Sequence, residues 1–107
     1  MAQGEPFFDV KIDCAASGDN TVITGTSGQT IKIWSVFLWW SATVSVILKD
    51  GASTRNLTGV LPGVAQARII MDETAHPWFT LTAGNAFIIN LSGATQVSGT
   101  IRYTKAA

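Results

Sequence analysis

Charged and chemically reactive side chains are scarce in this chain of 107 residues. Asp, Glu, Lys and Arg together make up 13% of it, the formal net charge is zero, and there is one cysteine and one histidine. Because no excess of Lys and Arg is available to neutralise phosphate groups, we expect neither nucleic acid nor an anionic membrane as a partner. Since Cys14 is alone, no intrachain disulfide can form, and stability must come from packing or association.

The residues that could support catalysis lack the partners that catalysis needs. His76 stands before Pro77 in a predicted turn, without the second histidine or the cysteine pair that a metal site requires. Cys14 ends the apolar face of a predicted strand, where it packs as a small hydrophobe. Asp9 and Asp13 are about 13 Å apart along that strand, too far for a glycosidase pair. We therefore expect no enzyme, no catalytic residue, no metal and no cofactor.

Long stretches with helical periodicity are also absent, and turn-forming residues punctuate the chain instead. The runs between these turns are short, rich in β-branched and aromatic residues, and often alternate between apolar and polar positions. This pattern predicts one all-β domain over residues 1–107, a jelly-roll-like β-sandwich of about eight or nine short antiparallel strands, with an immunoglobulin-like sandwich as the alternative. The predicted strands cover residues 7–14, 21–25, 30–39, 42–49, 54–58, 67–72, 78–82, 86–91 and 95–104.

Two of the predicted turns are useful markers. Asp50-Gly51 is the strongest hairpin signal in the sequence, because glycine takes the positive φ that a tight hairpin turn demands. Pro62-Gly63 is also predicted to be a turn.

The N-terminus is predicted to be a short extended arm over about residues 1–8. It lacks the basic start and apolar stretch of a secretory signal, so we expect the chain to be made and kept in the cytoplasm of the cell that produces it. Pro6 disfavours helix, and Phe7 and Phe8 would offer apolar anchors for a groove or a sheet edge of a partner. A frayed terminus that leads into the first strand is an equally weighted alternative.

A run of uncharged residues, IWSVFLWWSATVSVIL, occupies positions 33–48 between Lys32 and Lys49. A helix needs about 20 apolar residues to span a bilayer, and this run is shorter and contains four hydroxyl side chains. We therefore predict two strands that turn near residues 40–42, and no membrane span.

Both faces of the first of these strands are apolar. Even positions hold Trp34, Val36, Leu38 and Trp40, and odd positions hold Ile31, Ile33, Ser35, Phe37 and Trp39. Because a two-layer sandwich has one inner face, one of the two sets must point outward. The even set alone would expose roughly 500–700 Å² of apolar surface, as much as the largest patch of a typical monomer. We predict that the even set, or else the odd set, forms the contact of a homo-oligomer or another partner.

Residues 78–103, WFTLTAGNAFIINLSGATQVSGTIRY, together with SGQTIKIWSV and LKDGASTRNLTG upstream, resemble a pattern of small structural proteins from tailed bacteriophages. The pattern is a strand, an A-G-N-A turn, an apolar strand that ends in N-L-S-G, and a closing strand V-x-G-x-I-x-Y. It covers about 70 of the 107 residues. Such phage proteins include capsid decoration (cement) proteins, which are often β-sandwiches that clamp neighbouring major capsid subunits from outside the shell.

The resemblance implies a virion structural protein on the capsid surface, with the major capsid protein as its partner. In this case Pro6, Phe7 and Phe8 of the arm would contact the shell. A homo-oligomer would touch several shell subunits at once, and the linked contacts would raise its avidity. A trimer is favoured if the protein sits at local threefold axes, whereas twofold sites would suit a dimer. Related modules in head fibres and tail tips leave a receptor- or carbohydrate-binding module as the alternative function.

Overall fold

Two antiparallel β-sheets make up the fold. The computed structural model describes residues 6–52 and 55–107, and every regular element within these ranges is a strand. The strands are β1 (Phe8–Cys14), β2 (Gly18–Ile23), β3 (Thr30–Trp40), β4 (Val44–Asp50), β5 (Arg55–Asn56), β6 (Leu61–Gly63), β7 (Arg68–Met71), β8 (Phe79–Thr80), β9 (Phe87–Leu91) and β10 (Val97–Ala106). The predicted all-β class is thereby confirmed.

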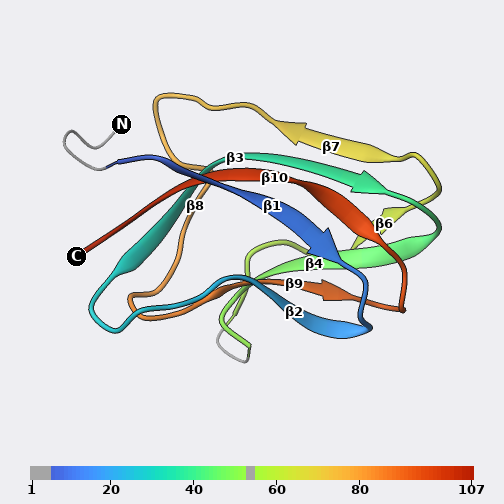
Figure 1. Ribbon diagram of the computed structural model, residues 1–107, viewed down its shortest axis with the longest axis horizontal. Coiled ribbons are helices and arrows are strands. Elements are labelled where there is room, and N and C mark those ends of the chain that lie inside the picture. Colours follow the sequence, from blue (N-terminus) through green and yellow to red (C-terminus); the bar gives the residue numbers. More distant parts are fainter. Residues whose placement is uncertain (1–5, 53–54) are drawn as a thin grey trace.

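The two sheets lie one above the other as the layers of a sandwich (Figure 1). Sheet A has the order β1-β10-β3-β7, and β8 also pairs with β3. Sheet B has the order β2-β9-β4-β5, and β6 also pairs with β4. The chain changes sheet between β1 and β2, again between β2 and β3, and again between β3 and β4, so the first four strands alternate between the two layers.

Side chains from the inner faces of both sheets form one hydrophobic core. Because successive side chains of a strand point to opposite faces, alternate residues of each long strand enter it. Sheet A supplies Ile12, Cys14, Val36, Leu38, Trp40, Val97 and Ile101, and sheet B supplies Ile23, Val44, Val46, Leu48, Phe87, Ile89 and Leu91. The outward residues of β1 are Asp9, Lys11 and Asp13, so the predicted alternation of this strand is confirmed.

A β-bulge at Trp34 interrupts the alternation in β3. Ser35 pairs with Arg102 of β10 and Ile33 pairs with Tyr103, which leaves Trp34 as the extra residue. An extra residue reverses the phase of a strand, so odd residues before the bulge and even residues after it face the core. Trp34 lies outside the core cluster, and its Nε1 donates a hydrogen bond to Oγ1 of Thr104 at 3.0 Å.

The structure differs from the predicted strands most clearly at β6, which occupies the predicted turn at Pro62-Gly63. Proline cannot donate a hydrogen bond to a neighbouring strand, and it is tolerated here because β6 pairs only with β4 among the described strands. The predicted hairpin at Asp50-Gly51 is present: Asp50 of β4 pairs with Arg55 of β5, and Gly51 has a φ of 76°.

The indole of Trp40 lies against the backbone of β6. Trp40 is 1% exposed, and its Nε1 donates a hydrogen bond to the carbonyl oxygen of Val44 at 2.9 Å. Gly63 is the residue of β6 that pairs with Val44, and a Cβ atom at Gly63 would overlap the indole ring. Close packing, rather than an unusual backbone conformation, therefore requires glycine at this position.

We expect Gly63→Ala to lower the free energy of unfolding by about 1–3 kcal/mol, because the added methyl group overpacks the site under Trp40. Urea denaturation monitored by tryptophan fluorescence measures this change. Gly93→Ala is the matched control: no atom lies within 4 Å of a Cβ added at Gly93, so the control should retain full stability. Equal midpoints for the two variants would contradict the packing argument.

Candidate interaction surface

The structure buries the predicted interface residues inside the single subunit. Trp34 and Val36 are each 2% exposed, Trp40 is 1% exposed and Leu38 is fully buried. The prediction that the even-numbered set points outward is therefore wrong. The bulge explains the difference, because it turns Val36, Leu38 and Trp40 toward the core and leaves Trp34 under the chain's own N-terminal segment.

The described part of the N-terminal arm packs on sheet A. The ring of Phe7 meets the indole of Trp34 edge to face, with ring centroids 5.6 Å apart, and the Arg102 guanidinium lies 5.7 Å from the Phe7 ring. Phe8 already belongs to β1, is 44% exposed, and contacts the ring of Tyr103. Pro6 is exposed, and residues 1–5 of the predicted arm lie outside the described residues. A contact of Pro6, Phe7 and Phe8 with a shell stays a prediction.

The odd-numbered residues after the bulge form the outward face of β3. Phe37 is 39% exposed and pairs with Ile70 of β7, which is 61% exposed. On its other side Phe37 pairs with Thr100, which in turn pairs with Lys11 of β1. Cross-strand partners point to the same face of a sheet, so a row across four strands of sheet A carries two adjacent apolar side chains that are open to solvent.

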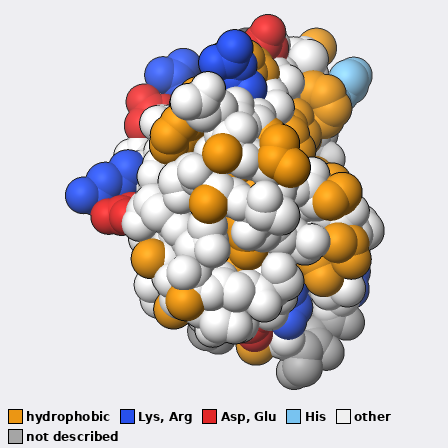
Figure 2. Space-filling view, turned by 90° about the vertical axis from the view of Figure 1, so that its right-hand side faces the viewer, with side chains coloured by type: hydrophobic (Ala, Val, Ile, Leu, Met, Phe, Trp, Pro, Cys, Tyr) orange, Lys and Arg blue, Asp and Glu red, His pale blue; other side chains and the backbone are white. Residues whose placement is uncertain are grey.

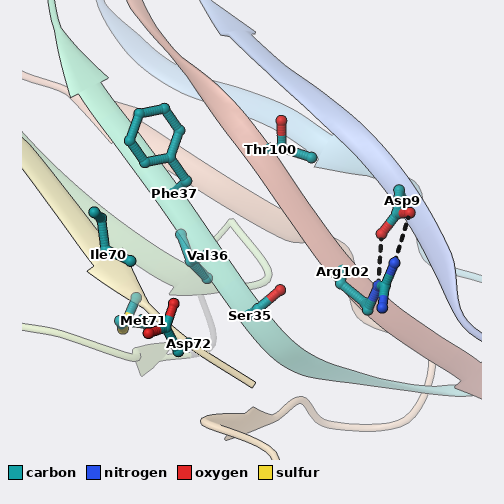
Figure 3. Close-up of a pocket in the computed structure, with 9 residues that line it drawn as sticks. All are labelled: Asp9, Ser35, Val36, Phe37, Ile70, Met71, Asp72, Thr100 and Arg102. Atoms are coloured by element: carbon teal, nitrogen blue, oxygen red, sulfur yellow. Dashed lines mark hydrogen bonds and ion pairs between the residues drawn. The ribbon is translucent and has the colours of Figure 1, made fainter.

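A shallow groove of about 310 Å³ runs along this row. Figure 3 shows Phe37 and Ile70 on neighbouring strands, with the Asp9–Arg102 pair on the other side of β3 from Ile70. The remaining lining residues are Ser35, Val36, Met71, Asp72 and Thr100. The groove therefore has an apolar floor and charged or hydroxyl groups around it. We call Phe37, Ile70 and this groove the outer patch.

An ion-pair cluster bounds the outer patch at one end. Arg102 binds the carboxylate of Asp9 through Nε at 2.9 Å and Nη2 at 3.2 Å, and it approaches Glu73 at 3.5 Å. The hydrogen bond from Arg102 lowers the pKa of Asp9, and the same contact raises the pKa of Arg102. Both groups are solvent-exposed, and Arg102 and Asp9 neutralise each other at this end of the patch.

The residues weighed as catalytic candidates form no catalytic cluster among the described residues. His76 is exposed in the connection between β7 and β8, and its carbonyl oxygen accepts a hydrogen bond from Thr74. Cys14 is buried, and burial raises the pKa of its thiol. Asp13 accepts a hydrogen bond from Gln96 at 2.7 Å. Each of them has a structural environment that fits a packing or surface role.

Asp50 is a buried carboxylate, although the sequence predicts for it only a place in a hairpin turn. It accepts hydrogen bonds from the backbone N–H and the hydroxyl of Thr82, from Asn85, and from Arg55 at 2.8 Å. Burial raises the pKa of Asp50, but these hydrogen bonds together outweigh burial and hold the pKa below its usual value. The signal was present in the sequence, because Asp50 continues the inward phase of Val44, Val46 and Leu48 in β4.

Comparisons with known proteins identify no family for this chain. No family model matches it, and no curated protein matches its sequence. Within residues 6–52 and 55–107, no helix is long and apolar enough to cross a bilayer. Across the same residues, no three His, Cys, Asp or Glu side chains lie together as metal ligands would. Function must therefore be argued from the fold and its surfaces.

We expect Asp50→Asn to destabilise the protein by roughly 2–4 kcal/mol at pH 7, because an amide cannot accept all the hydrogen bonds that the buried carboxylate accepts. A carboxyl whose pKa is lowered by folding contributes stability above its unfolded pKa of about 3.9 and loses it as pH falls through the folded value. The difference between wild type and variant should therefore shrink below about pH 4.

Urea midpoints at pH 7 and pH 3 measure this difference. Asp72→Asn, which changes an exposed aspartate, is the control and should match wild type at pH 7. An Asp50→Asn variant as stable as that control would show that the Asp50 carboxylate does not stabilise the loop that contains Thr82 and Asn85.

Proposed function

We propose that this protein is a virion structural protein: a decoration subunit, with a jelly-roll fold, that binds the outside of a bacteriophage capsid. The observation that carries the proposal is the outer patch, where an all-β subunit of 107 residues presents exposed apolar side chains on a sheet face. The sequence resemblance to small phage structural proteins supplies the partner, the major capsid protein. The host cytoplasm would be the place of synthesis and the capsid surface the place of action.

The strand order supports the jelly-roll part of the proposal. The first strand pairs with the last, β1 with β10, and the second with the second to last, β2 with β9. A jelly roll has two antiparallel sheets wound from Greek-key connections, and the fold is common in viral capsid and lectin domains. An immunoglobulin-type sandwich keeps its first two strands in one sheet, whereas β1 and β2 lie in different sheets here.

The size of the outer patch supports multivalent binding. Phe37 and Ile70 offer a small apolar contact, flanked by the Asp9–Arg102 pair, and such a contact gives modest affinity for each copy. A homo-oligomer that engages several shell subunits at once converts modest contacts into high avidity. This arrangement would stabilise a shell without a single strong site.

A carbohydrate-binding module is the second candidate, and one observation favours it. The groove places the exposed ring of Phe37 beside the hydroxyls of Ser35 and Thr100 and the carboxylate of Asp72. An aromatic face bordered by hydrogen-bonding groups suits a sugar ring, and jelly rolls include lectins. In this case the protein would belong to a fibre or tail rather than to the head.

We expect a Phe37→Glu/Ile70→Glu variant to bind phage heads at least about tenfold more weakly than wild type, because two apolar anchors become charged. Co-sedimentation with heads stripped of the native protein measures binding. Asn56→Glu adds a charge at an exposed position of sheet B and should bind as wild type does.

Quantitative mass spectrometry of intact particles separates the two candidate functions. A decoration subunit should be present in numbers comparable to the major capsid protein, whereas a fibre module should be much rarer. Undiminished head binding by the double variant, or glycan binding that the double variant alone loses, would count against the capsid assignment.

A further inference from the structure

One free margin of sheet A is the edge of β1. This strand has seven residues, pairs with β10 without a bulge, and contains no proline. Among the described residues, its only strand partner is β10. A long and regular edge strand presents unpaired backbone groups along one side and can accept another strand there.

The outward side chains of β1 decide which strand can be accepted. They alternate in sign as Asp9, Lys11 and Asp13. Asp9 is held by Arg102, whereas Asp13 is hydrogen-bonded to the neutral side chain of Gln96. Within the described residues, the side chain of Lys11 makes no ion pair or hydrogen bond. One anion and one cation on this edge are therefore available for a partner.

A groove lies beside the same edge, where an added strand would cover it. It has a volume of about 270 Å³ and lies between β1 and β2, the free margins of the two sheets. Val10, Lys11, Asp13 and Cys14 line it from β1, and Asn20, Thr21 and Val22 line it from β2. Val10 and Val22 are only partly buried there, so apolar surface remains open at this margin.

We propose that β1 pairs antiparallel with β1 of a second copy about a twofold axis at Ile12. In this register Lys11 stands opposite Asp13 of the second copy in both halves of the contact. Val10 stands opposite Cys14, so the inward pairs are all apolar. The paired segment, residues 10–14, contains the four β1 residues that line the groove. The two A sheets become one continuous sheet, and the exposed margin of each subunit is closed.

Two neighbouring registers fit less well. An axis at Lys11 would place Lys11 opposite itself and Asp9 opposite Asp13, and like charges directly opposite destabilise a strand pair. An axis at Val10 would pair Lys11 with Asp9, which Arg102 already neutralises, and would set Asp13 opposite Phe7. A single closed twofold contact also departs from the trimer that the resemblance favours. This contact stands independently of the proposed capsid role.

Charge reversal tests the contact in solution. We expect Lys11→Asp and Asp13→Lys each to weaken a wild-type dimer by at least about tenfold in Kd, because two attractive pairs become repulsive. The double variant Lys11→Asp/Asp13→Lys restores opposite charges across the axis and should recover dimerisation. Sedimentation equilibrium at low and high salt gives the Kd values, and urea midpoints confirm that each variant is folded.

Cysteine cross-linking tests the register. In a Cys14→Ala background, Lys11→Cys/Asp13→Cys should give a covalent dimer on oxidation. The pair Asp9→Cys/Lys11→Cys would report the axis at Val10, and Lys11→Cys alone would report the axis at Lys11. A monomeric wild type at about 100 μM, where even weak dimers form, would overturn the proposal. So would a trimer that both single reversals leave intact, or cross-linking confined to a control pair.

Discussion

The two sheets share one hydrophobic interior, and β3 must supply the central part of it. This constraint decides which side of β3 can ever meet solvent or a partner. Residues before the bulge enter the core at odd positions, Ile31 and Ile33, and residues after it enter at even positions, Val36, Leu38 and Trp40. A strictly alternating strand would have left one of these groups on the outer surface. The extra residue, Trp34, lets both groups be buried.

The bulge also shows which features of the fold could be predicted from the sequence and which could not. The all-β class, the alternation of β1 and the hairpin after Asp50 follow from side-chain periodicity and turn chemistry, which are local properties. The choice between the even and odd faces of β3 is not local, because one inserted residue reverses it and the pairing with β10 sets its place. Strand β6 was not predicted because Pro62-Gly63 has the local pattern of a turn. A proline fits a strand only at the edge of a sheet, and the sequence alone does not show that β6 is such an edge.

The margins of the two sheets are protected in different ways. On one side the edges are short or contain proline, since β5 has two residues, β6 carries Pro62 and β7 has four residues. On the other side β1 is long, and its alternating charges restrict which strand can pair with it. Where the apolar core ends near β8, the buried carboxylate of Asp50 replaces hydrophobic packing and ties the loop before β9 to β4. The long edge at β1 and the end near β8 therefore use charged groups, whereas the opposite edges rely on short strands and proline.

The outer face of sheet A keeps exposed apolar side chains even though Trp34 and Trp40 are buried. At one end of this face the chain covers itself, because Phe7 packs on Trp34. Farther along β3 no such cover lies over Phe37 or Ile70 among the described residues, and both remain open to solvent. Figure 2, a view onto the right-hand end of Figure 1, shows hydrophobic side chains gathered toward its right-hand margin, while most of the Lys, Arg, Asp and Glu side chains in view lie at the top and left.

A second aromatic side chain from the arm could have closed the outer patch, but Phe8 belongs to β1 and contacts Tyr103 instead. Side chains alternate along an extended chain, so Phe7 and Phe8 point to opposite faces, and the described part of the arm covers only one end of sheet A. The open apolar row at Phe37 is thus a consequence of the strand register, and no described part of the chain covers it.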